Sequence, residues 1–182
     1  MATSTNPTRL VTGKVRLSYV KVSTPDENGK YSLCVLIDKK DKVTLAKIKA
    51  AVDFLKTDPK AVGIWKSKFL DFKTPLRDGD KEKDTDGQPE YKDHYFLNCS
   101  TRTQPQIVDT ERNPIISNEE LYSGCYARLS LNLYAFNVEA KGIAVGLNNI
   151  QKLGDGDRLD SHTSAEDDFG PDEGEEEEDF LG

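Results

Sequence analysis

Aromatic, amide and guanidinium side chains alternate with apolar ones along the segment from residue 126 to residue 136. Aromatic rings offer flat apolar surfaces on which unpaired bases of any identity stack, at about 1–3 kcal/mol per base. Arginine and asparagine between the rings can hold phosphates and base edges. This combination favours binding of single-stranded nucleic acid, whose bases are open to such contacts. The predicted contacts on this face are Tyr126, Arg128, Asn132, Tyr134 and Phe136.

A second row with the same mixture of side chains strengthens this interpretation. The segment from 96 to 102 alternates an aromatic, an amide, a hydroxyl and a guanidinium side chain with other residues. Cations elsewhere in the chain extend the surface on which phosphates could lie. In the competing interpretation, each ring instead covers the second side of a curved sheet beneath a helix. The predicted nucleic-acid contacts outside residues 126–136 are Lys14, Arg16, Arg77, Phe96 and Arg102.

Signatures of catalysis are scarce in this chain. It has only two histidines, His94 and His162, and neither a phosphate-binding P-loop nor a G-x-G-x-x-G motif. A serine or cysteine nucleophile therefore has no convincing base, and two histidines do not form a metal site here. Asp78 and Asp80 could hold Mg²⁺ for a nuclease, but lysines crowd the same loop, and such mixtures usually lie at the surface. We predict a protein that is not an enzyme, with no catalytic residue, no metal and no cofactor.

The acidic stretch 82–93 has the spacing of a calcium-binding loop but not its residues. Acidic side chains stand at relative positions one, three, five, nine and twelve, with glycine at six. However, Glu82 replaces the usual aspartate at the start, Asp93 replaces the bidentate glutamate at the end, and Pro89 lies inside. A solvated surface loop is the favoured interpretation, and calcium binding is left open.

Strand-like alternation and turn residues predict the elements that must position the polar face. Asn28-Gly29 favours a hairpin between the first two strands, and residues 103–105 connect the next two in a similar way. The clearest strand is 126–136, where five small or apolar residues from Ala127 to Ala135 occupy the face opposite the aromatic one. The predicted strands are 11–20, 31–37, 95–101, 106–108, 126–136 and 142–147.

The segment between the second and third predicted strands has apolar residues at helical spacing. Leu45, Ile48, Val52 and Leu55 recur at helical intervals between Asp41, a suitable N-cap, and Pro59, which should close the helix. A second short helix is predicted over 61–69, followed by a polar surface loop up to Pro89. A mostly antiparallel meander with such an insertion predicts a mainly β fold, an OB-fold-like antiparallel β-barrel with one or two helices inserted.

Charge divides the chain into a basic body and an acidic tail. Residues 154–182 carry 13 acidic side chains and one basic one, a net charge of −12, so the whole-chain charge of −7 leaves residues 1–153 at +5. We predict a binding domain over 1–153 and a disordered tail over 154–182. The tail could recruit basic partners or compete with nucleic acid for the body. Solubility alone does not explain the apolar residues Phe169, Phe180 and Leu181 that stand among the acids.

Cysteine usage and hydropathy indicate the compartment. Cys34, Cys99 and Cys125 are odd in number and far apart, which argues against a disulfide framework and against a zinc ribbon. A reducing cytosol is therefore expected. No segment reads as a signal peptide or a membrane span, so we expect no membrane association. The sequence leaves the oligomeric state open, and a homo-oligomer is compatible with it.

Four segments together resemble a bacteriophage single-stranded DNA-binding protein family with an OB-fold. They are residues 12–19, 73–80, 122–128 and 141–152, and the resemblance runs in order along nearly the whole chain. It implies a five-stranded barrel that coats single-stranded DNA in phage replication, recombination and repair, in the cytoplasm of a bacterial host. It also implies an acidic tail that contacts replication or recombination proteins. Similarity to other replicative single-strand binders, whose acidic tails end with an aromatic residue, assigns these contacts to Asp167, Asp168, Phe169, Glu178, Asp179 and Phe180.

Two departures from the expected pattern stand out. Leu181 and Gly182 follow Phe180, so a pocket that demands a terminal aromatic residue would not accept this tail. The helix follows the second strand, whereas in the usual OB order it follows the third, so the 70–93 segment hides a strand or is an elaboration. The alternative function is an acidic-tailed protein-interaction adaptor or nucleic-acid mimic. RNA binding also stays open, because stacking surfaces do not sense the 2′-hydroxyl.

Overall fold

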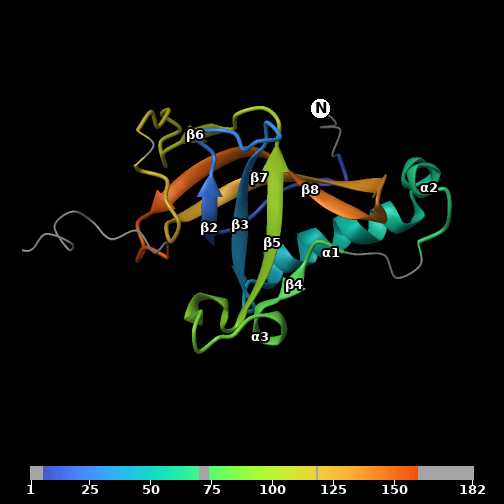
Figure 1. The fold of residues 1–182 in the computed structure, drawn as a ribbon, viewed down its shortest axis with the longest axis horizontal. Helices are drawn as coiled ribbons and strands as arrows, with labels where there is room; N and C mark the ends of the chain where they lie inside the picture. The colour runs from blue at the N-terminus through green and yellow to red at the C-terminus, as the bar shows by residue number, and fades with distance from the viewer. Residues whose placement is uncertain (1–5, 70–73, 118, 160–182) are drawn as a thin grey trace, which may run out of the picture.

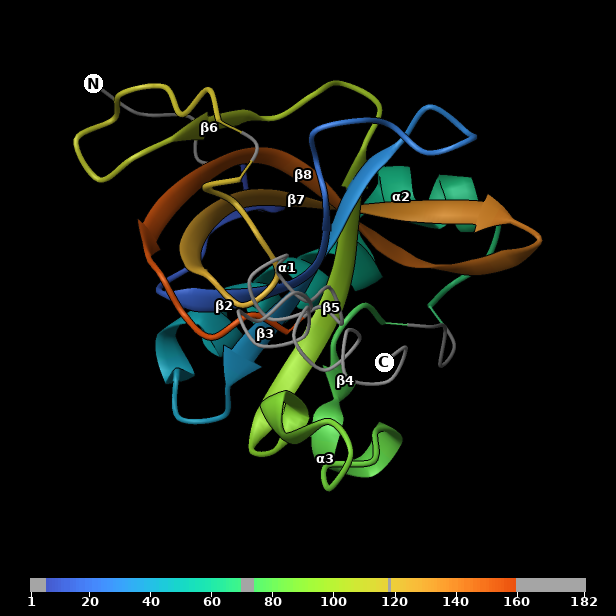
Figure 2. The same cartoon turned by 60° about the vertical axis from the view of Figure 1, so that its left-hand side comes forward.

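The computed structural model describes residues 6–69, 74–117 and 119–159 and shows a curved β-sheet that closes on itself (Figures 1 and 2). Strand β7 (Tyr126–Val138) pairs with β1 (Arg9–Val11) and β2 (Val15–Lys21) along one edge and with β8 (Ala140–Gly154) along the other. Strand β3 (Tyr31–Asp38) joins β2 to β5 (His94–Thr101). A parallel bridge between Ser100 of β5 and Gly146 of β8 closes the barrel. This is the predicted OB-like barrel.

Alternation along the strands builds the barrel core. In β7 the residues predicted to face inward, Ala127, Leu129, Leu131, Leu133 and Ala135, are all buried. They pack in one cluster with inward residues of β3 and β8, such as Val35 and Val145. Because successive side chains of a strand point to opposite faces, the other row of β7 is left on the outside. The core therefore determines which side chains the barrel presents.

The first predicted strand, 11–20, is divided in the structure. Strands β1 and β2 are separated at Gly13, whose N–H donates to Thr44 Oγ1 at 2.9 Å instead of to a neighbouring strand. The hydroxyl of Thr12 accepts a hydrogen bond from Leu129 N at 3.0 Å, so the chain stays attached to β7 through the break. The interruption lets one segment follow the curve of the barrel.

Two consecutive helices follow β3. Helix α1 (Lys42–Thr57) begins as predicted after Asp41, whose carboxylate accepts a hydrogen bond from Thr44 N at 3.2 Å. Its buried side chains, among them Ile48, Ala51, Val52 and Leu55, join the barrel core, and Figure 2 shows the helix behind the curved sheet. Pro59 opens helix α2 (Pro59–Trp65) as well as following the end of α1, because proline suits the first turn of a helix.

The 106–108 strand pairs differently from the prediction. Strand β6 (Gln106–Val108) runs parallel to β8, with Ile107 opposite Ile150, and makes no hairpin with β5. Strand β5 has no edge to offer it, because β3 occupies one edge over its whole length and β4 and β8 share the other. The predicted hairpin of 95–101 with 106–108 is therefore wrong.

The segment before β5 carries short elements in place of the predicted plain loop. It contains β4 (Arg77–Asp78), α3 (Gly79–Glu82) and the 3₁₀ helix η1 (Pro89–Tyr91). The two-residue strand β4 pairs with the start of β5, so the segment both hides a strand and elaborates the barrel. With β1 and β2 counted together as the first barrel strand, helix α1 lies between the second barrel strand, β3, and the third, β5, as the sequence indicated. We call residues 77–93 the insert.

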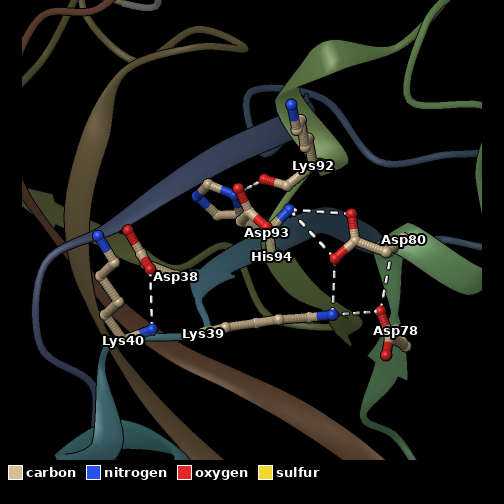
Figure 3. Close-up of polar contacts among 8 residues, drawn as sticks. All are labelled: Asp38, Lys39, Lys40, Asp78, Asp80, Lys92, Asp93 and His94. Carbon is tan, nitrogen blue, oxygen red and sulfur yellow. Dashed lines mark hydrogen bonds and ion pairs between the residues drawn. The ribbon is translucent and has the colours of Figure 1, made fainter.

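Lys39 anchors the insert to the end of β3 (Figure 3). Its Nζ lies 2.8 Å from Asp78 Oδ1 and 2.6 Å from Asp80 Oδ2, and Asp93 N donates to Asp80 Oδ1 at 3.1 Å. The ion pairs raise the pKa of Lys39 and lower the pKa of both carboxyl groups. These two carboxylates, considered above as Mg²⁺ ligands, are thus engaged with a lysine. In the described part of the chain no group of three or more His, Cys, Asp or Glu residues could hold a metal ion.

None of the helices in the described residues has the length and apolar character needed to span a bilayer. The residues assigned from sequence to the start of the tail contact the barrel. Gly154 ends β8, and residues 155–159 continue along the barrel surface, with Leu159 N donating to Ser123 O at 2.9 Å. The tail residues singled out above, from Asp167 to Phe180, lie outside the described residues.

Candidate nucleic-acid interface

One row of side chains crosses five strands on the outer face of the barrel. Strand pairing places Tyr126 of β7 beside Arg16, Arg16 beside Leu36, Leu36 beside Phe96, and Phe96 beside Arg77 of β4. Their chain neighbours, such as Leu17 and Val35, point into the core. With about 4.8 Å between neighbouring strands, the row spans about 19 Å. We call these five residues the cross-strand row, and four of them were predicted from sequence.

Cations lie over the rings at both ends of the cross-strand row. Lys14 Nζ stands 4.8 Å from the centre of the Tyr126 ring, and Arg16 Cζ stands 5.7 Å from it. At the other end, Arg77 Cζ lies 4.7 Å from the Phe96 ring and Lys83 Nζ lies 5.3 Å from it. Such contacts hold positive charge beside an aromatic surface. A phosphate and its base could therefore be bound side by side at either end.

Two of these arginines already have partners. Arg77 forms a forked contact with Glu82, with its Nε 3.1 Å from both carboxylate oxygens and its Nη2 3.0 Å from Oε1. Arg16 donates from Nε to Gly124 O at 3.0 Å and from Nη2 to Asp157 O at 2.7 Å. The first pairing neutralises charge, whereas the second uses neutral carbonyl groups and leaves the charge of Arg16 uncompensated.

Phe96 is buried, with only 2% of its surface exposed. It belongs to a second apolar cluster with Cys34, Leu36 and Tyr91, outside the barrel core. The Tyr91 ring meets it edge to face at 5.2 Å between centres. Burial raises the pKa of the Cys34 thiol to about 11 and also raises the pKa of the Tyr91 hydroxyl. Phe96 is thus a covered ring in this structure, held under the insert.

A second, more polar row crosses strands β3, β5, β8, β7 and β1. It places Ser32 beside Ser100, Ser100 beside Gly146, Gly146 beside Asn132, and Asn132 beside Arg9 of β1. A side chain at Gly146 would bring its Cβ to within 2.7 Å of Asn132 Oδ1, so glycine is required for the amide to lie there. Because Ser32, Ser100 and Gly146 are small, the backbone or a base of a nucleic acid has room to approach this row, close to the amide of Asn132 and the guanidinium of Arg9.

The remaining predicted contacts do not join the cross-strand row. Arg128 is exposed on β7 and donates to Thr12 O at 3.4 Å, while Arg102 is exposed in the turn after β5. Tyr134 is 43% exposed and Phe136 is half-buried opposite Gly142. Ten residues of extended strand separate Tyr126 from Phe136, about 33 Å. The predicted residues therefore line a long surface rather than one compact pocket.

Sequence reasoning missed several residues that the fold brings to this surface. Arg9 lies just before the predicted first strand, and it faces outward only because the chain is interrupted at Gly13 between β1 and β2. Lys83 and Tyr91 reach Phe96 only because the insert folds back over β5. Leu159 packs against the same cluster from the far end of the chain. No local pattern in the sequence signals these last three positions.

The eight strands of the described residues form a closed barrel of five, counting β1 and β2 as one, with β4 and β6 added at its edges. Such a barrel, with rings and cations in register on its outer face, defines an OB-type domain of the kind that binds nucleic acids. Comparison with models of protein families identifies one family for this chain. The chain belongs to the family described as the single-stranded DNA-binding protein of Enterobacter phage Enc34, whose model matches residues 8–181. The resemblance inferred from sequence is thereby confirmed.

Solved structures share this fold. The single-stranded DNA-binding protein from bacteriophage Enc34 is 22% identical, with a TM-score of 0.73 over 90% of each chain. The same protein in complex with single-stranded DNA also gives a TM-score of 0.73, over 85% of this chain and 91% of that one. The single-stranded DNA-binding protein gp2.5 of bacteriophage T7 is 13% identical, with a TM-score of 0.53 over 88% of this chain and 91% of that chain.

A curated relative matches part of the sequence. A putative protein, p50, of Acyrthosiphon pisum secondary endosymbiont phage 1 is 32% identical over 83 residues. The match spans 45% of this chain and 43% of that relative, so the chain matches less than half of the relative's length.

Proposed function

We propose that this chain binds single-stranded DNA with little sequence preference, and that it does so without catalysing a reaction. The cross-strand row carries the proposal, because it sets aromatic rings beside cations on the outer face of an OB-type barrel, and the charges of Arg16 and its neighbour Lys14 are not neutralised by a carboxylate in the described residues. Family membership supports it, and so does the shared fold with a phage protein described in complex with single-stranded DNA. The work of such a protein is to coat DNA during phage replication, recombination and repair in the cytoplasm of the host.

Binding would combine two kinds of contact. Rings such as Tyr126 and Tyr134 would stack on bases, which is insensitive to base identity because every base has a flat face. Cations such as Arg16, Lys14 and Arg128 would neutralise phosphates and release counterions. Duplex DNA keeps its bases stacked inside the helix, so only the second contact is open to it. The site should therefore prefer single strands.

We propose that the acidic residues beyond the barrel have a separate role. The tail has a net charge of −12 beside a body of +5, so it can compete with DNA for the basic surface. Because the tail belongs to the same chain as the barrel, its local concentration there is high, and DNA occupancy would release it to replication or recombination proteins. The proposed partner contacts are those named above, Asp167, Asp168, Phe169, Glu178, Asp179 and Phe180.

The test is a salt-dependent titration of the full chain with a labelled oligothymidine and a duplex of the same length. We expect tighter binding to the oligothymidine, with affinity that falls linearly on a log–log salt plot at about 0.7 per phosphate neutralised. An oligouridine arm measures the preference for DNA over RNA. A chain that ignores the oligothymidine at low salt would refute the proposal and favour a protein-binding adaptor.

A further inference from the structure

The segment that follows β8 is fastened across the outer face of the barrel. We call residues 155–159 the stem. The Tyr122 hydroxyl lies 3.1 Å from Asp155 Oδ1 and 3.0 Å from Gly156 O, and Arg16 Nη2 donates to Asp157 O at 2.7 Å. Gly124, at a φ of +116°, lets the chain pass so close that a side chain there would collide with Asp157 O. These contacts fix the path of the stem over β2 (Figure 2).

The stem ends on the covered aromatic cluster. Leu159 packs against the cluster of Cys34, Leu36, Tyr91 and Phe96. Its backbone N–H donates to Ser123 O at 2.9 Å, which holds the residue at this place. Within the described residues, Leu159 is the only member of this group that belongs neither to a barrel strand nor to the insert. It is therefore the part of the cover that could leave without breaking the sheet.

The surface beneath Leu159 has the chemistry of a base-binding site. Leu36 and the rings of Phe96 and Tyr91 supply apolar contact area, and Arg77 and Lys83 stand 4.7 and 5.3 Å from the Phe96 ring. A base stacked on Phe96 would have its phosphate beside these two cations. The site also lies on the cross-strand row, three strands from Tyr126, so one strand of DNA could reach both rings.

We propose that the cluster under Leu159 is a subsite for an unpaired nucleobase, and that Leu159 occupies it until DNA displaces the stem. This inference rests on the proposed single-strand binding. It differs from competition by the acidic tail in its physical basis. The ion pair of Asp155 with Lys152, at 2.7 Å, also holds the stem and is screened by salt. Burial of Leu159 is not screened, whereas attraction between the tail and basic residues is.

The experiment compares Leu159→Ser with the wild-type full chain by oligothymidine titration at about 50 mM and about 500 mM salt. We expect Leu159→Ser to bind about fivefold more tightly at both concentrations, because displacing a half-buried leucine no longer opposes binding. Val43→Ser is the matched control, since Val43 is 68% exposed on helix α1 and belongs neither to the stem nor to the cluster. It should bind as wild type does.

The second arm tests whether a base enters the vacated place. In the Leu159→Ser chain, Phe96→Leu keeps an apolar side chain but removes the ring and should lower affinity about fivefold or more, whereas Phe96→Tyr should retain it. Should Phe96→Leu fail to fold, Tyr91→Leu removes the other ring and decides the question. Unchanged affinity of Leu159→Ser at high salt, or of the ring-deleted double variant, would overturn this inference alone. A wild-type chain that does not bind oligothymidine would instead refute the proposed function.

Discussion

Neutralising Glu82 should strengthen DNA binding by releasing Arg77. The carboxylate of Glu82 holds the guanidinium with contacts of 3.0–3.1 Å, and a phosphate must compete with it. The two side chains are 46% and 39% exposed, so the pair contributes only about 0.2–1 kcal/mol to stability. Glu82→Gln keeps the shape of the side chain and removes its charge. The fold should survive the change while the site gains one available cation.

The magnitude follows from counterion release. One further phosphate contact should steepen the log–log salt slope by about 0.7, which corresponds to about a fivefold larger loss of affinity over a tenfold rise in salt. Arg77→Gln should make the slope shallower by whatever share of this contact Arg77 already makes in the wild type, so the slopes of Glu82→Gln and Arg77→Gln should differ by about 0.7 in total. The double variant should behave as Arg77→Gln does, because Glu82 then has no cation to restrain.

The assay is an anisotropy titration with labelled oligothymidine at four or more salt concentrations, with melting temperature measured in parallel. Lys81→Gln is the matched control, because it removes a cation from the same short helix without touching the pair. Equal slopes for wild type, Glu82→Gln and Arg77→Gln would refute the reasoning. Arg77 would then belong to the architecture of the insert and not to the DNA site.

Four further outcomes are expected. Tyr134→Ala should cost about 1–3 kcal/mol of single-strand affinity with an unchanged melting temperature, because the ring is 43% exposed; wild-type affinity would exclude it as a stacking surface. Arg128→Ala should reduce the salt slope by about 0.7, and an unchanged slope removes it from the site. Deleting residues 160–182 should tighten binding at low salt by an amount that shrinks as salt rises, and should abolish capture of replication proteins; equal low-salt affinity would contradict competition by the tail. The pairing with Lys39 lowers the pKa of Asp80, so the pair stabilises the insert at pH values above 3.8, the ordinary pKa of the carboxyl group, and this stabilisation is lost as the pH falls through the folded-state pKa. The protection factors of amides in the insert, which are corrected for the intrinsic exchange rate at each pH, should therefore fall in acid, and Lys39→Met should remove that pH dependence.

Local patterns predicted the barrel well because its strands alternate cleanly. The run in β7 from Ala127 to Ala135 has one fully apolar face, and the spacing of Ile48, Val52 and Leu55 identified α1. The pairing of β6 with β8 could not be predicted, because it depends on which strand edges remain free after the barrel closes. Non-local pairing of this kind leaves no trace in the residues of either strand.

The candidate site was predicted in its residue types more than in its arrangement. Tyr126, Arg16 and Phe96 were identified one by one, but their alignment in one row follows from strand register. In β3 both faces are apolar in part, since Cys34 and Leu36 lie opposite the core residues. A pattern that marks one face as buried gives no warning that an insert and a distant leucine cover the other.

The position of the single tryptophan separates two optical signals. Trp65 is fully buried in α2, and its Nε1 donates to Gly142 O at 2.9 Å. Gly142 lies in β8 opposite Phe136, near the end of β7 that is remote from Tyr126. Its emission should therefore follow the packing of the helix on the barrel and stay constant when DNA occupies the cross-strand row. The tyrosines of the outer face should respond to stacked bases. One unlabelled sample thus reports folding at one wavelength and occupancy at another, so a variant that binds weakly can be told apart from one that has lost its fold.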